Sequence, residues 1–159
     1  MNKLLALFLF SIVAFSQPSK SVVSRDEKEA LAVVNKLFDA MRTKDADAMR
    51  AVFSAEGRLT ATQRRDGKPS VRIYSGEEFV KLIAGTNGVL KERMYKPETR
   101  VSGDLALVSG RYGFYVDDRF SHCGMNSFHL MRVADDWKIV NAASTIELEG
   151  CEPESREKQ

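Results

Sequence analysis

Two histidines, His122 and His129, are the side chains in this sequence best suited to proton transfer, because imidazole titrates near neutral pH. Both lie in the run 120–133, whose aromatic and apolar residues predict a strand. Ser121 precedes His122, but neighbours on a strand point to opposite faces, so this adjacency does not indicate a catalytic pair. Without a visible carboxylate partner, each histidine is a weak catalytic candidate, and a structural role is the favoured interpretation.

Four ring-bearing side chains are the predicted ligand-binding residues, namely Tyr112, Phe114, His122 and Phe128. Alternation along a strand places Tyr112 and Phe114 on one face of 105–116, and His122 and Phe128 on one face of 120–133. Aromatic faces can stack on a flat ligand. The alternative is that these rings simply belong to the hydrophobic core.

Charged side chains are scarce in the long strands. Outside the turns, the runs 105–116, 120–133 and 137–146 contain no Asp or Glu. A pocket carboxylate is what proton-moving enzymes commonly use, so this absence argues against such a mechanism. Arg111 suits either an anionic ligand group or an ion pair. The hypothesis that the protein binds a ligand without transforming it therefore depends on a binding cavity with almost no acidic side chains. A carboxylate deep inside that cavity would contradict the hypothesis.

Acidic residues at the strand ends indicate turns. Asp117 and Asp118 follow one long strand, and Asp135 and Asp136 follow the next. The side chains of turn aspartates usually accept hydrogen bonds from the local backbone. A further role for Asp117 or Asp118 is the less favoured alternative.

The sequence contains two cysteines, Cys123 and Cys151. If the last two strands form a hairpin around Asp135, residue 123 lies opposite roughly residue 147, and a bend at Gly150 can return Cys151 to Cys123. We therefore predict a disulfide, with a buried residue plus a tail thiol as the alternative. Further ligands at metal-binding spacing are missing, so neither a metal nor another cofactor is expected.

The first residues are typical of an export signal. A basic start at Lys3 precedes the apolar run 4–15, which is too short to span a membrane, and Ala14 and Ser16 are small residues at the two positions a signal peptidase reads. We expect residues 1–16 to be a signal peptide, residues 17–24 a flexible leader and residues 149–159 a charged tail. The mature protein would be periplasmic or extracellular and not embedded in a membrane. A net charge of +2 without a basic stripe argues against binding to nucleic acid.

The preceding segments predict helices and a hairpin. Ser24 and Glu27 form a capping box before an amphipathic helix, and Asp45 begins a second helix expected to end near Gly57. A hairpin around Asp66-Gly67, a capped short helix and a strand or strand pair broken at Pro97 follow, over residues 58–74, 75–85 and 89–102.

This order of elements, with the text LAVVNKLFDAMRTKDADAMRAVFSAEGRL and FSHCGMNSFHLMRVADDWKIVNAAST, resembles the nuclear transport factor 2-like (SnoaL-like) superfamily. The segments SHCG and DDWKIV are most similar to its bacterial branch described as lumazine-binding-like. The resemblance covers residues 25–148. It implies an α+β cone, in which N-terminal helices pack on a strongly curved antiparallel β-sheet, as in cystatin-like folds. It does not fix the function, because this fold serves many activities.

Three functions follow as hypotheses. The first is an exported, non-enzymatic domain that binds a small, flat molecule in the cone. The second is an isomerase, dehydratase or cyclase that uses a pocket histidine. The third is a structural dimerisation module. Both faces of the long strands carry apolar residues, so we also expect a homodimer through the sheet.

Overall fold

The computed structural model describes residues 23–151 of the chain. The predicted signal peptide, most of the leader and most of the charged tail lie outside the described residues. The elements are α1 (Arg25–Thr43), α2 (Ala46–Val52), β1 (Phe53–Arg65), β2 (Lys68–Ser75), α3 (Gly76–Gly85), β3 (Leu90–Ser102), β4 (Leu105–Val116), β5 (Arg119–Val133) and β6 (Asp136–Ile146). No helix among these is long and apolar enough to cross a bilayer.

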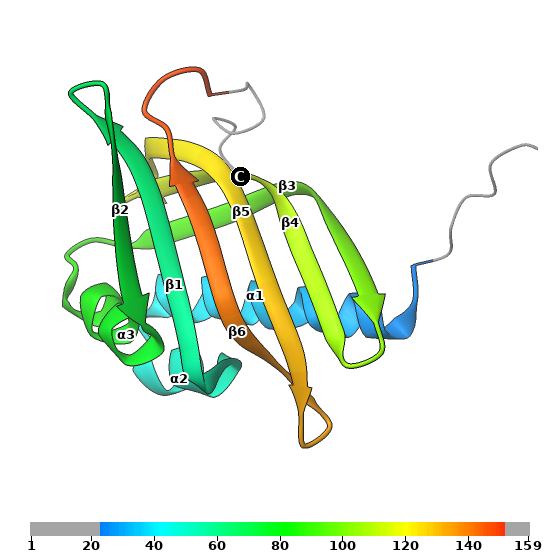
Figure 1. The fold of residues 1–159 in the computed structure, drawn as a ribbon. Coiled ribbons are helices and arrows are strands. Elements are labelled where there is room, and N and C mark those ends of the chain that lie inside the picture. Colours follow the sequence, from blue (N-terminus) through cyan, green and yellow to red (C-terminus); the bar gives the residue numbers. More distant parts are fainter. Residues whose placement is uncertain (1–22, 152–159) are drawn as a thin grey trace, which may run out of the picture.

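Helix α1 begins at the predicted capping box. The Ser24 hydroxyl accepts a hydrogen bond from the Glu27 amide at 3.1 Å, and the Glu27 carboxylate accepts one from the Ser24 amide at 2.6 Å. The apolar residues spaced along one side of the helix are buried, namely Ala30, Val34, Leu37, Phe38 and Met41. Their burial fixes α1 across one face of the sheet, as Figure 1 shows.

The six strands form one sheet in the order β2-β1-β6-β5-β4-β3. All neighbours are antiparallel except β1 and β6, which are parallel. The predicted β1–β2 hairpin turns at Asp66 and Gly67, both with positive φ, as a two-residue turn of this kind requires. Helices α2 and α3 lie at the β1–β2 end of the sheet, and α1 runs beneath the remaining strands (Figure 1). The predicted α+β architecture is confirmed.

One predicted boundary was wrong, and the structure decides between the two alternatives left open for another segment. Helix α2 ends at Val52 and not near Gly57, because Phe53 already pairs with Ile139 of β6 and begins β1. Of the two alternatives predicted for residues 89–102, one strand or a strand pair, the structure has the single strand β3. Pro97 falls at a bulge between Tyr95 and Glu98 on an edge strand, where the missing amide leaves no central ladder bond unmade.

The face of the sheet that α1 covers carries one parity of each long strand. Ala106, Val108 and Tyr112 of β4 are buried there, with Phe128 and Leu130 of β5. The opposite parity faces away and includes the large apolar residues Leu105, Leu107, Met125, Met131 and Val133, which are exposed. The helix-covered face therefore supplies the core and the walls of any internal cavity.

Candidate functional site

A cavity of about 200 Å³ lies between the helices and the helix-covered face of the sheet. Its walls come from all six strands together with α1 and α3. The apolar lining includes Leu37, Phe38, Met41, Leu59, Phe79, Ile83, Phe114, Phe128 and Ile146. Polar side chains also line it, namely Gln63, Ser70, Arg72, Tyr74, Glu92, Tyr112, His122 and Ser144. Such a hollow, mostly apolar with a few polar groups, is typical of a small-molecule site.

The four predicted ligand-binding residues all line this cavity. The His122 ring stacks on Phe114, with centroids 4.7 Å apart and planes inclined by 18°. Tyr112 meets the same imidazole edge-on at 5.8 Å. Phe128 lies further along β5 and packs edge-on against Phe38 of α1 at 5.9 Å. One wall of the cavity is therefore a cluster of rings, in which His122 and Phe114 stack on each other and Tyr112 stands edge-on to them.

The two histidines lie in different environments. Burial lowers the pKa of His122, because desolvation disfavours the charged imidazolium. Its Nδ1 lies 3.0 Å from the Ser121 hydroxyl, so the hydrogen bond expected of an acid-paired catalytic histidine is not the one it makes. His129 is exposed on the opposite face of the sheet, between Leu107 and Asn141, and does not line the cavity.

A carboxyl group lines the cavity, and the expectation of a cavity almost without acids is wrong. Glu92 comes from β3, outside the three strands on which that expectation was based. Glu92 as a whole is half-buried. The surrounding protein nevertheless desolvates its carboxyl group and raises the pKa of that group to about 7. These observations agree if the remaining access is through the hollows that Glu92 borders. Alternation with Leu90 and Met94 was the available signal, because it places Glu92 on an apolar face.

A buried amide holds Glu92. Asn126 is fully buried, and its Nδ2 donates a hydrogen bond to Oε1 of Glu92 at 2.6 Å. The Ser144 hydroxyl donates to Oδ1 of Asn126 at 2.8 Å, which fixes the orientation of the amide. The two hydrogen bonds thus connect β6, β5 and β3 through polar side chains inside an otherwise apolar face.

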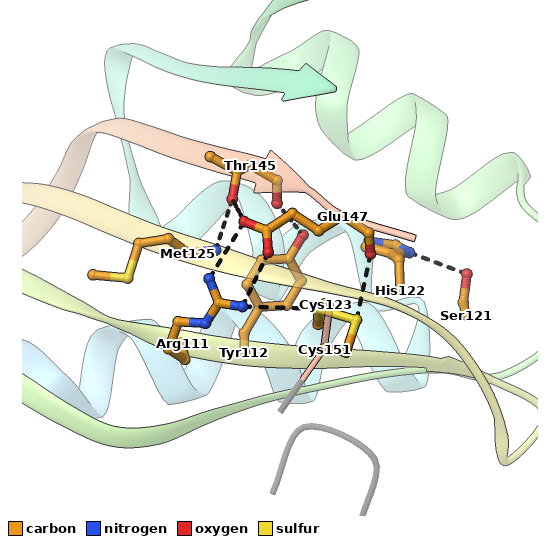
Figure 2. The surroundings of a disulfide bond; sticks show 9 residues. All are labelled: Arg111, Tyr112, Ser121, His122, Cys123, Met125, Thr145, Glu147 and Cys151. Carbon is orange, nitrogen blue, oxygen red and sulfur yellow. Dashed lines mark hydrogen bonds and ion pairs between the residues drawn. A yellow bond between two sulfur atoms is a disulfide. The ribbon is translucent and has the colours of Figure 1, made fainter. Parts of the chain in front are cut away.

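Tyr112 forms part of the wall and does not offer a free hydroxyl. Its hydroxyl donates to the Thr145 carbonyl oxygen of β6 at 2.8 Å, and burial raises its pKa well above the ordinary value (Figure 2). The ring crosses β5 above Gly124, where a β-carbon would overlap the Thr145 carbonyl and crowd the tyrosine ring. Glycine at position 124 therefore allows the tyrosine to span from β4 to β6.

The predicted disulfide is present between Cys123 and Cys151, with Cα atoms 5.8 Å apart. Cys123 pairs with Glu147 through two backbone hydrogen bonds, as the hairpin register predicted. Arg111 donates to the Glu147 carboxylate at 3.0 Å beside this disulfide (Figure 2). That ion pair lies on the face opposite the cavity, so Arg111 is not placed to anchor a ligand inside it.

The turn aspartates have local partners. Asp117 has a positive φ and accepts a hydrogen bond from the Val89 amide at 2.8 Å. Asp118 forms an ion pair with Lys91 at 2.6 Å. Both contacts join the β4–β5 turn to the start of β3, and neither residue lines the cavity.

The family model described as "Putative lumazine-binding" matches residues 25–143, which include the helices and the cavity-lining residues up to β6. No curated protein matches the chain.

Solved structures share the fold at low sequence identity. A protein with a cystatin-like fold from Nostoc punctiforme is 9% identical, with a TM-score of 0.63 over 78% of this chain and 92% of that one. A "putative dehydratase" of the NTF2-like family from Streptomyces avermitilis is 15% identical, with a TM-score of 0.60 over 77% and 96%. An NTF2-like protein from Cytophaga hutchinsonii is 12% identical, with a TM-score of 0.63 over 77% and 99%. These likenesses confirm the predicted nuclear transport factor 2-like cone.

Proposed function

The chain belongs to the family described as putative lumazine-binding, and we propose that its domain binds a small, flat molecule in the cavity of the cone. The observation that carries this proposal is the wall formed by Tyr112, Phe114 and His122. A flat ligand gains most when its face lies against rings and water is displaced from both surfaces. The cavity is smaller than the ~300–1,000 Å³ of drug-sized sites, so the ligand is of the size of one or two fused rings.

Titration with lumazine, the ring system in the family description, tests this proposal. We expect saturable binding by calorimetry that weakens roughly tenfold or more in Phe114→Ala, because a stacked ring is lost from the wall. Phe120→Ala is the matched control. Phe120 also packs edge-on against a ring, Tyr115, but does not line the cavity. Equal loss in both variants, or no change in Phe114→Ala, would contradict binding at the ring wall.

A proton-transfer enzyme is the second candidate, and Glu92 is the observation that favours it. A carboxyl with a pKa near neutrality can both accept and release a proton at physiological pH. This residue replaces the histidine as the proposed acid–base group, since His122 lacks an acidic partner. A non-enzymatic binding protein was the preferred hypothesis because the cavity was expected to contain almost no carboxyl groups, and Glu92 contradicts that expectation.

Hydrogen exchange distinguishes the enzyme from the non-enzymatic binding protein. Ligand recovered from protein purified from its own host would be incubated with the protein in heavy water. An enzyme that moves a proton at carbon introduces deuterium into the ligand, detected by mass spectrometry, and Glu92→Gln does not. A non-enzymatic binding protein returns the ligand with its carbon-bound hydrogens unexchanged.

Export and dimerisation complete the proposal. The disulfide supports an oxidising compartment, which agrees with a signal peptide over residues 1–16. The exposed apolar residues on the face away from the helices support a homodimer through the sheet. Residues of the cavity would then remain accessible in each protomer, because the two faces are separate.

A further inference from the structure

The place of Glu92 in the sheet gives it a role in choosing the ligand. In the register of the sheet Glu92 lies opposite Phe114, and Phe114 lies opposite His122. The three side chains therefore form a row across β3, β4 and β5 on the cavity side. A flat molecule lying against the rings would have one edge facing the carboxyl.

The hydrogen bonds of Glu92 leave one oxygen available. Oε1 accepts from Asn126, whose amide is oriented by Ser144. Among residues 23–151, Oε2 makes no hydrogen bond and Glu92 forms no ion pair. Because Oε1 already accepts the hydrogen bond from Asn126, a protonated Glu92 can carry its proton on Oε2 and donate it to a ligand.

The groups around Glu92 do not supply a compensating positive charge at close range. Tyr112 and His122 line the same cavity from β4 and β5, and Asp39 of α1 borders the neighbouring hollow. Arg93 of β3 also borders that hollow, where its guanidinium lies over the Tyr95 ring. Arg72 lines the cavity from β2, at the opposite edge of the sheet, and is exposed. Desolvation is therefore the main influence, and it raises the pKa of Glu92 to about 7.

We propose that Glu92 in its carboxylic-acid form selects the ligand, by donating a hydrogen bond from Oε2 to a carbonyl oxygen or ring nitrogen on the edge of a flat molecule. This inference rests on the proposed binding function. It assigns the ligand to a chemical class, uncharged aromatic heterocycles or ring ketones, since these offer an acceptor to the carboxylic acid without adding a negative charge beside it. Asn126 is a positioning residue in this arrangement.

Two probes of the same shape test the assignment. Naphthalene and quinoline differ by one ring nitrogen, which is a hydrogen-bond acceptor. At about pH 6, where Glu92 is mostly protonated, wild-type protein should bind quinoline about three- to tenfold more tightly than naphthalene, the contribution of one neutral hydrogen bond. At about pH 8.5 the carboxylate is an acceptor only, so the preference should disappear.

Two variants show whether the preference depends on a hydrogen-bond donor at position 92 and on the protonation of that side chain. Glu92→Gln carries a donor at every pH, so its preference for quinoline should persist at both pH values. Glu92→Leu has no donor and should show no preference at either. Circular dichroism checks the fold of each, and the wild-type comparison of the two pH values needs no variant.

The outcomes are distinguishable. Wild-type protein that binds both probes equally at about pH 6 overturns the role of Glu92 while leaving the cavity as a binding site. A preference retained in Glu92→Leu also overturns it. If neither probe nor lumazine binds, the proposed binding function itself fails.

Discussion

At the scale of single residues, burial changes two titratable groups in the cavity in opposite directions. It raises the pKa of the Glu92 carboxyl to about 7 and lowers that of the His122 imidazole. The cause is the same in both, since a cavity wall solvates an ion less well than water does. Around neutral pH the lowered pKa favours the uncharged imidazole, and the carboxyl is partly protonated. The cavity is therefore suited to an uncharged, polarisable guest.

Stability should depend on pH through Glu92. The folded chain holds the proton up to about pH 7, whereas the unfolded chain releases it near the ordinary value of 4.5. The free energy of unfolding should therefore be greatest below about pH 4.5 as far as this group is concerned, fall as the pH rises toward 7, and then level off. The fall is at most about 3 kcal/mol, and access to water in the cavity reduces it to about 1–3 kcal/mol.

Urea unfolding from about pH 4.5 to 8 measures this fall, which should be absent in Glu92→Gln. Glu98→Gln, on the same strand but exposed and paired only with Arg100 at 3.6 Å, is the matched control and should follow wild type. Parallel profiles for wild type and Glu92→Gln would show that the carboxyl titrates normally.

Trp137 is the largest side chain that β6 contributes to the core. It is only 4% exposed, and the Arg132 guanidinium covers its ring at 4.4 Å from the centroid. Trp137→Ala should lower the free energy of unfolding by about 3–5 kcal/mol, since truncation leaves a cavity. Chemical denaturation provides the measurement, and Leu148→Ala, at a residue 73% exposed, should change stability by less than about 0.5 kcal/mol. A loss below about 1 kcal/mol for Trp137→Ala would mean that the ring contributes little to the core.

At the scale of elements, the end of β6 is held to its neighbours by several contacts. The Tyr112 hydroxyl binds the Thr145 carbonyl, Cys123 pairs with Glu147, and Arg111 binds the Glu147 side chain. The disulfide then joins Cys151 to β5 (Figure 2). Residues 147–151 are thus joined to β4 and β5. These contacts fix the end of β6, the strand that carries Ser144. They therefore also support the hydrogen bonds that run from Ser144 through Asn126 to Glu92.

Removing the disulfide should cost stability and leave the cavity wall in place. Cys151→Ala is preferable to a change at Cys123, which is fully buried and would add a packing cost of its own. The bridged cysteines are 28 residues apart, for which loss of the crosslink should lower the free energy of unfolding by about 2–4 kcal/mol. Urea unfolding with and without reductant measures it. Reductant should destabilise wild type and leave the variant unchanged, and an equal response from both would count against the bridge.

Local sequence signals predicted the elements better than they predicted the site. The Asp66-Gly67 turn and the capping boxes at Ser24 and Ser75 depend on neighbouring residues, and all three are present. The four ring-bearing residues were predicted together because strand alternation places them on one face. Glu92 was missed because its desolvation arises from β5, β6 and the helices, whereas its alternation with Leu90 and Met94 indicates only the face on which it lies. The end of α2 was missed for the same reason, since pairing with β6 begins β1 early.

At the scale of the whole molecule, one sheet has two differently used faces. The helices cover one face and enclose the cavity, while the other exposes Leu105, Leu107, Met125, Met131 and Val133 on β4 and β5. Leu105 lies directly opposite Met131 in the register, so Leu105, Leu107, Met131 and Val133 form an apolar strip, which Ser127 and His129 separate from Met125. A strip of this kind is stabilised when a second surface covers it.

Dimerisation through this strip should be visible in solution. We expect sedimentation equilibrium to give twice the monomer mass. A stable dimer of this kind buries roughly 1,200–2,000 Å² of surface at its interface. Met131→Glu should shift the protein to monomer, because a symmetric interface would place the new carboxylate in a desolvated apolar contact. Val23→Glu is the matched control, since Val23 is 54% exposed but precedes α1, which packs on the other face of the sheet. It should remain dimeric. A monomeric wild type would remove the dimer, whereas dissociation by both variants would place the interface elsewhere. Because the cavity opens on the other side of the sheet, monomeric Met131→Glu should still bind lumazine with wild-type affinity.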